Sequence, residues 1–214
     1  MKKIFITLLG ALMLLCGQRV NAQISDIDGT WSFGGGFTGM SVTGSDAELL
    51  KTAGFPSMVP GFYFGASIDY AFSAIEGLTV EPGAYIAHYG KSFKFGLADD
   101  DKPYHANYLR IPVNLRYAFP MGDSSLGVTV FTGPRINIGV GGNMFSAGKT
   151  YPGIKPLDAQ WGFGLAFTIQ DAIVINGGYD LGITNCLKNN KDLGIQDEIA
   201  RRNSFVIGVN FMFK

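Results

Sequence analysis

The sequence predicts an all-β fold, an eight-stranded antiparallel up-and-down transmembrane β-barrel of the outer-membrane type. Three observations support this prediction. Apolar residues alternate with small or polar ones over eight segments, a pattern typical of strands with one face in an apolar medium. Short and long connections alternate strictly between these segments. The apolar positions of the second to the eighth segment include no Asp, Glu, Lys or Arg.

The composition agrees with this fold class and excludes others. Hydrophobic residues make up 47% of the 214 residues and charged residues only 16%, against about 25% charged residues in soluble domains. Glycine contributes 30 residues, and aromatic residues reach 13%. A disordered chain would be richer in charge and poorer in aromatic residues. Basic and acidic residues balance at 17 each without a basic cluster, so we expect no nucleic-acid partner.

Residues 1–22 have the pattern of a secretory signal peptide. Two lysines precede an apolar stretch at 4–16, and small residues at 20–22 supply a cleavage site. The stretch of 13 residues is too short for a membrane-spanning helix, which needs about 20. We therefore expect export through a cleaved signal peptide, and a single outer-membrane β-barrel domain in residues 23–214.

The two cysteines limit the chemistry that remains. An alternative hypothesis is a lipoprotein acylated at Cys16, although Leu15 stands where such a signal needs a small residue. Once residues 1–22 are removed, Cys186 is the only cysteine of the sequence. An intramolecular disulfide and a sulfur-ligated metal cluster are thereby excluded. We expect no cofactor and no metal.

The first four strands are predicted at 30–42, 62–72, 78–88 and 109–119. The first is weak, because many glycines accompany the apolar side that Trp31, Phe33 and Phe37 form. The second is regular, with small or polar residues between its apolar positions Phe62, Phe64, Ala66, Ile68, Tyr70 and Phe72. Successive side chains of a strand point to opposite faces. Each segment therefore has one apolar and one polar face.

The last four strands are predicted at 126–140, 161–169, 173–183 and 205–213. Leu, Ile, Val or an aromatic residue fills most of their apolar positions, with Thr132 and Gly177 as exceptions. Lipid offers no hydrogen-bond partner to an open sheet edge, so the last strand should pair with the first. Aromatic residues near segment ends suit girdles at the membrane interfaces; they are Phe62, Phe72, Tyr117, Phe119, Trp161, Phe205 and Phe213.

The connections divide into two classes that alternate along the chain. The short ones are 73–77, 120–125 and 170–172, and the long ones are 43–58, 91–105, 142–159 and 185–202. In an antiparallel meander alternate connections lie at the same end, so one end is tight and the other carries the bulk. Outer-membrane barrels show this asymmetry, with short periplasmic turns and long extracellular loops.

The medium around the apolar face separates a membrane barrel from a soluble one. A soluble barrel of the lipocalin type also alternates, but its apolar face points inward and many Lys and Glu residues would cover its outside. Here the polar face is mostly Gly, Ala, Ser, Thr, Asn and Tyr, which suits a narrow lumen. A Lys or Arg at the bilayer midplane would cost roughly 2–4 kcal/mol. The absence of charge from the apolar positions therefore predicts contact with outer-membrane lipid.

Three prolines fall inside predicted strands. Pro82, Pro112 and Pro134 each remove a backbone donor from the sheet. We therefore expect them at bulges or near strand ends.

Charged residues on the polar faces supply the candidate site. By parity, six of them point into the lumen as a polar network: Asp69, Glu81, Arg110, Arg116, Arg135 and Asp180. Tyr63, Tyr85, Asn114, Asn137, Asn176 and Asn210 would complete it. Charges inside a barrel must be paired or hydrated. The network is either a salt-bridged core that plugs the lumen or a polar path, and the narrow lumen of an eight-stranded barrel favours the plug.

Other motifs give no catalytic assignment. Some outer-membrane barrels hydrolyse lipids with serine and histidine at the rim, but Ser92 near His88, and His105, form no nucleophile motif. The glycines at 34–36 lack the helix that follows a phosphate-binding loop. The aspartates at 99–101 lack EF-hand spacing. The sequence therefore predicts a protein that is not an enzyme.

Three stretches of sequence resemble a known family. Tyr-Leu-Arg-Ile-Pro-Val at 108–113, Leu-Thr-Val-Glu-Pro at 78–82 and Tyr-Asp-Leu-Gly-Ile-Thr at 179–184 are similar to segments of the PorT-type outer-membrane β-barrel proteins of Bacteroidetes. The resemblance extends over most of residues 30–214. It implies an outer-membrane barrel in a family whose namesake is implicated in protein secretion to the cell surface. The final Phe213-Lys214 departs from the terminal aromatic residue common in such barrels.

Two functions are compatible with these features. The first is a non-enzymatic outer-membrane barrel whose long extracellular loops stabilise the envelope or bind a protein partner. The second is a small-solute channel or an accessory component of protein secretion to the cell surface. In either case the barrel would depend on the barrel assembly machinery for insertion.

Overall fold

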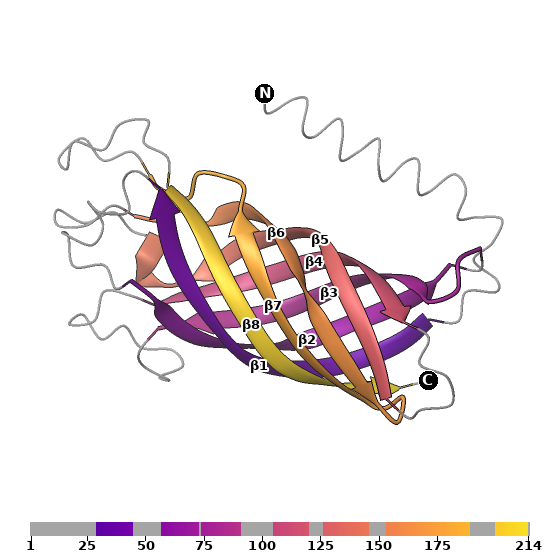
Figure 1. Ribbon diagram of the computed structural model, residues 1–214. Coiled ribbons are helices and arrows are strands. Elements are labelled where there is room, and N and C mark those ends of the chain that lie inside the picture. The colour runs from indigo at the N-terminus through magenta and orange to yellow at the C-terminus, as the bar shows by residue number, and fades with distance from the viewer. Residues whose placement is uncertain are drawn as a thin grey trace.

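A computed structural model describes residues 29–44, 57–72, 74–90, 105–119, 126–145, 153–188 and 200–213. They form the strands β1 (Gly29–Gly44), β2 (Val59–Ala71), β3 (Leu78–Tyr89), β4 (Ala106–Phe119), β5 (Leu126–Gly141), β6 (Leu157–Ile169), β7 (Ile173–Gly182) and β8 (Ala200–Phe213), and the short 3-10 helix η2 (Asn143–Phe145). Each strand pairs with the next in an antiparallel sense, and β8 pairs with β1 (Figure 1). The predicted all-β, eight-stranded up-and-down barrel is confirmed.

Several expectations lie outside the described residues. They are the signal peptide at 1–22 with Cys16, the turn at 120–125, Ser92, and the aspartates at 99–101. Across the described ranges, no helix has the length and apolar character needed to cross a membrane.

Closure of the sheet is continuous along β1 and β8. Their pairing runs from Trp31↔Phe213 to Gly44↔Ala200 without a register shift. The described strands therefore present no open sheet edge, and their backbone groups find partners within the sheet except beside the prolines. Figure 1 shows the strands running obliquely around the barrel, with the C-terminus beside the turn between β6 and β7.

Five strands begin earlier than the alternation predicts, and β6 and β8 do so by the most residues. β6 begins at Leu157, four residues before the predicted start, and β8 begins at Ala200, five residues before its predicted start. Both additions lie at the end of the barrel that carries the long connections, which we call the loop end. In the added part of β8, the outward-facing positions are Arg201 and Asn203, so the apolar alternation stops although the pairing with β1 continues.

The three prolines interrupt the sheet without a bulge, contrary to the expectation. The pairs on either side of Pro82, Pro112 and Pro134 keep one register in the β2–β3, β3–β4 and β4–β5 ladders. Each proline also stays paired with the strand on its other side. In an antiparallel strand the backbone N–H and C=O of one residue face the same neighbour. A missing donor therefore weakens one ladder and leaves the other intact.

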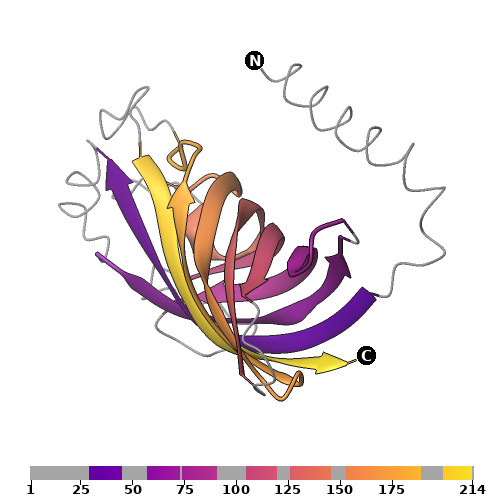
Figure 2. The ribbon, with the colours of Figure 1, turned by 45° about the vertical axis from the view of Figure 1, so that its right-hand side comes forward.

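The outside of the barrel is apolar and the inside is crowded. Large apolar side chains lie exposed on all sides, with Phe37 on β1, Phe64 on β2 and Trp161 on β6 among them. At the end with the short turns, the Tyr117 and Phe119 rings pack edge to face at 5.2 Å. Figure 2 shows the strands wrapping around a common interior. The alternation of the sequence thus puts its apolar side outward, as predicted.

Candidate functional site

Asp180 joins two arginines in the middle of the barrel. Its side chain is fully buried and accepts from Arg110 Nη2. Its other carboxylate oxygen, Oδ1, lies 2.9 Å from Arg135 Nε. The three residues come from β7, β4 and β5, so the ion pairs reach across the lumen. One carboxylate therefore compensates two buried guanidinium groups, which leaves this layer with one excess positive charge.

A second group of charges lies nearer the short turns. Arg116 Nη1 is 2.6 Å from Asp69 Oδ2 and 3.4 Å from Glu81 Oε1. Glu81 also accepts from Ser67 Oγ at 2.7 Å and from Asn114 Nδ2 at 2.9 Å. This layer holds one arginine and two carboxylates, so it has one excess negative charge. The two layers together are neutral.

The six residues expected in the lumen all point inward and are buried or nearly so. Their additional partners are more varied than the sequence suggests. Tyr63 donates to Asn176, and Tyr85 donates to Ser67. Asn137 is fully buried but binds Asp158 and Gln160 at a different level of the barrel. The lumen therefore contains separate layers of polar contacts along its axis.

Glycines opposite the long side chains make these contacts possible. A Cβ atom at Gly162 would collide with the guanidinium group of Arg135 and crowd Asp180. At Gly164 and Gly178 a Cβ atom would meet the Phe131 ring, which lies inside the barrel. The inward-facing glycines thus provide the volume into which arginine and aromatic side chains extend. An eight-stranded barrel is otherwise just wide enough for its side chains.

A third charged layer, which the predicted strand bounds left out, lies at the loop end. Arg202 on β8 holds Asp158 on β6 by two contacts, Nε to Oδ2 at 2.9 Å and Nη2 to Oδ1 at 3.0 Å. The guanidinium carbon of Arg202 lies 4.1 Å from the centre of the Tyr108 ring. Both charged residues stand in the added strand segments. Asp158 lies between outward-facing Leu157 and Ala159, where the alternation of β6 continues, whereas Arg202 lies beyond the apolar alternation of β8. Extending the inward parity of β6 and β8 by two to four residues would have found them.

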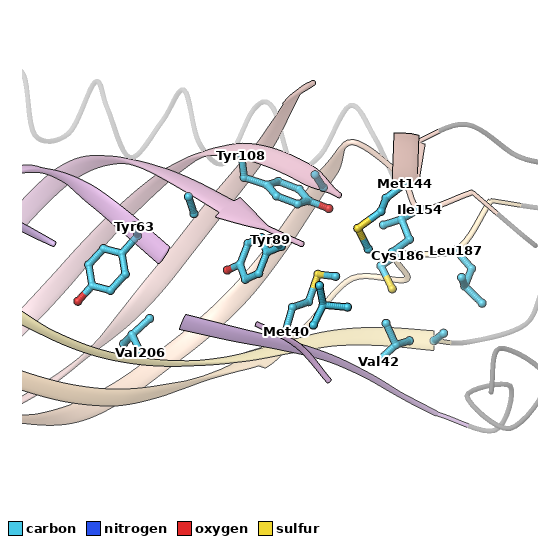
Figure 3. Packing of buried hydrophobic residues seen from close by; sticks show 14 residues of the cluster. Met40, Val42, Tyr63, Tyr89, Tyr108, Met144, Ile154, Cys186, Leu187 and Val206 are labelled. Carbon is cyan, nitrogen blue, oxygen red and sulfur yellow. The ribbon is translucent and has the colours of Figure 1, made fainter. Parts of the chain in front are cut away.

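A hydrophobic cluster fills the lumen at the same end (Figure 3). We call it the hydrophobic plug; it comprises Met40, Val42, Val59, Tyr63, Ala87, Tyr89, Ala106, Tyr108, Met144, Ile154, Cys186, Leu187, Ala200 and Val206. Figure 3 shows Met144, Ile154 and Cys186 from the connections meeting strand residues inside the barrel. Ile154 and Leu187 pair as an antiparallel bridge. The described residues of two long connections therefore pack into the lumen at this end.

Cys186 is inert within this plug. Its side chain is completely buried, and burial raises the pKa of its thiol to about 12. The thiolate, which is the reactive form, is therefore scarce at pH 8.

We expect a maleimide reagent to leave Cys186 unlabelled in the folded, detergent-solubilised protein at pH 8, because both burial and protonation protect the thiol. Heating in dodecyl sulfate should make it fully reactive. The matched control is Met58→Cys in a Cys186→Ser background, since Met58 is 51% exposed at the loop end. Rapid labelling of Cys186 in the folded protein would show that the plug is open.

The polar layers leave one cavity of about 70 Å³. It lies between the Asp180 and Arg116 layers, and its lining includes Arg110, Arg135 and Glu81. One water needs roughly 10–15 Å³ of such volume, so the cavity holds a few waters or one small ion. Drug-sized ligands occupy pockets of about 300–1,000 Å³. This cavity is therefore too small for a large organic ligand.

His88 lies on the outer face of the barrel, away from the charged layers of the lumen. His88 Nδ1 lies 2.7 Å from Asn107 Oδ1, and its ring packs against Phe62 at 5.3 Å. His88 and Asn107 are both at outward-facing positions. Over the same ranges no group of three or more His, Cys, Asp or Glu is placed to hold a metal ion.

The sequence of this closed antiparallel barrel matches a known protein family. Residues 21–188 match the outer membrane protein beta-barrel domain family. The chain belongs to this family. Membership in this family places the protein in the outer membrane, with its exposed apolar side chains against lipid.

Solved structures with a similar fold share little sequence with this outer membrane barrel. Neisserial surface protein A has 14% identity and a TM-score of 0.47, covering 87% of this chain and 100% of its own. Ail, the attachment invasion locus protein of Yersinia pestis, has 13% identity and a TM-score of 0.43, with coverage of 87% and 99%. The outer membrane enzyme PagL has 11% identity and a TM-score of 0.49, with coverage of 85% and 97%. No curated protein matches the sequence significantly.

Proposed function

We propose that the protein is a closed, non-enzymatic outer-membrane barrel that stabilises the envelope or presents its long connections to a protein partner outside the cell. The observation that carries this proposal is the filled lumen. The hydrophobic plug occupies the loop end, and the charged layers occupy the middle and the short-turn end. A barrel without a continuous water path acts through its surfaces and connections.

The plug weighs against the channel alternative. Its strand residues Met40, Tyr89 and Ala106 are fully buried, as is Cys186 from the connection after β7. The ion pair of Arg202 and Asp158 lies among these residues and is itself almost fully buried. A solute crossing the lumen would have to displace apolar packing and a desolvated ion pair. Breaking such a pair is costly because each charge would be left buried without compensation.

The narrower assignment to PorT-type proteins rests on the resemblance of three segments. These segments supply Glu81, Arg110 and Asp180, which all take part in the ion pairs of the lumen. The resemblance therefore coincides with the interior network and favours a shared way of filling the barrel. Export through a cleaved signal peptide, insertion by the barrel assembly machinery and a partner bound by the long connections belong to the same proposal.

Planar-bilayer recording tests the closed barrel. We expect the purified barrel, once incorporated, to give no steady current in 1 M KCl (about seven times physiological ionic strength), because apolar packing interrupts the water path. A porin of known conductance, inserted under the same conditions, is the positive control. Protease protection in the same lipid checks that the protein has inserted. A steady, ohmic current from the inserted wild-type protein would reject the closed barrel and favour a channel.

A further inference from the structure

We propose that the lumen cavity binds one small monovalent anion, such as chloride, between the guanidinium groups of Arg110 and Arg135. This inference goes beyond the proposed function, since a closed barrel does not require an ion. It rests on the charge of the cavity wall, on the donors that face it and on the access that its position allows.

The charge of the cavity is polarised along the barrel axis. Arg110 and Arg135 share the single carboxylate of Asp180, which leaves one excess positive charge at one end. The excess negative charge belongs to the other end, where Glu81 accepts from Ser67 and Asn114 and forms an ion pair with Arg116. An anion is therefore repelled from the Glu81 end and attracted to the arginine end. One unit of excess charge matches a monovalent ion rather than a dianion such as sulfate.

The two guanidinium groups at the arginine end have weak contacts besides Asp180. Arg135 pairs with Asp180 through Nε at 2.9 Å, and its Nη1 donates to the Gly133 carbonyl only at 3.4 Å. Arg110 donates from Nη2 to Asp180, and its Nη1 makes a long 3.5 Å contact with Tyr89. A halide between the two groups would accept from guanidinium donors whose present contacts with Gly133 and Tyr89 are long.

The cavity lies in the less completely buried part of the lumen. Arg135 and Arg116, on its wall, keep 5% and 8% exposure, whereas Arg202 and Tyr89 near the loop end keep 1% and 0%. Its volume of about 70 Å³ admits a chloride with one or two waters. The hydrophobic plug packs the loop end, so the ion would enter from the end that carries the short turns, past the Arg116 layer and the apolar cluster of Phe131, Ala166, Val174 and Met212.

Chloride NMR tests this site on the purified protein in detergent. We expect the folded wild-type protein to broaden the ³⁵Cl⁻ resonance beyond a detergent-only blank, and bromide to reverse the broadening while gluconate does not. The Arg135→Gln variant should weaken chloride binding roughly tenfold or more, since it removes a charged donor. Heat-modifiable gel migration confirms that each variant is folded.

Two further variants separate the site from unspecific ion effects. Glu81→Gln removes the opposing negative charge without altering Arg110 or Arg135, so it should strengthen chloride binding, an effect that a structural role alone does not predict. Arg201→Gln changes an exposed, outward-facing charge and should leave the broadening unchanged. If Arg135→Gln fails to fold, the chloride binding of Glu81→Gln still tests the proposal. No broadening by the wild type, or equal broadening by wild type and Glu81→Gln, overturns the proposal.

Discussion

Replacing Asp180 with alanine should lower the free energy of unfolding by roughly 3–5 kcal/mol, the usual cost of breaking a buried ion pair by removing one partner. The substitution leaves both Arg110 and Arg135 without their carboxylate inside the barrel. Neither guanidinium can deprotonate to escape this cost, because arginine stays charged in proteins. Urea titration of the protein refolded into phospholipid vesicles, followed by tryptophan fluorescence, measures the change.

Asp69→Asn is the matched control for Asp180→Ala. Asp69 also pairs with a buried arginine, but Arg116 keeps Glu81 as a second carboxylate at 3.4 Å. We therefore expect a clearly smaller loss of stability for Asp69→Asn. Equal losses for the two variants would mean that sharing of one carboxylate by two arginines is not what makes Asp180 critical.

Replacing Leu165 with arginine should destabilise the inserted barrel by roughly 2–4 kcal/mol, the cost of a lipid-facing arginine near the bilayer midplane. Leu165 is 48% exposed and lies in the middle of the outward-facing apolar series of β6. The guanidinium group would have to leave water for hydrocarbon, or distort the bilayer to reach it. The same urea titration in vesicles measures the difference from the wild type.

Leu157→Arg is the control at a different depth. Leu157 faces outward on the same strand and is 61% exposed, but it lies at the loop end. Near the interface a basic residue costs only about 0–1 kcal/mol. A similar loss of stability at both positions would contradict the contact of the apolar face with lipid. A loss of stability at Leu165 alone would place Leu165 near the bilayer midplane and Leu157 near the interface.

Most of the fold follows from a period of two in the sequence. The alternation predicts all eight strands because each has an outer face in lipid that tolerates no charge. It fails at the loop end of β8, where outward positions carry Arg201 and Asn203. There the backbone pairing persists although the selection for apolar residues has ended. Strand length is therefore set by closure with the neighbouring strands, which the residue pattern does not report.

The lumen is less predictable than the outer face. The alternation of side chains along each strand places Arg110 and Asp180 inside the barrel. It does not predict the ion pair between them, because β4 and β7 are not neighbours in the sheet. That contact depends on the reach of a long side chain across a space left by glycines. The plug residues that come from the connections have no periodic signal. Ile154 and Leu187 belong to connections, and only their packing inside the barrel reveals what they do.

The ladder between β1 and β8 has a kinetic consequence. Trp31 contacts Phe213 across almost the entire length of the chain. Contacts so distant in sequence carry a large loop-closure entropy and slow the search for the native state. A partial sheet would leave unsatisfied backbone groups in hydrocarbon. Cylinder formation is therefore cooperative, and a nascent polypeptide stopped before its final fourteen-residue strand has no stable intermediate to occupy in the bilayer.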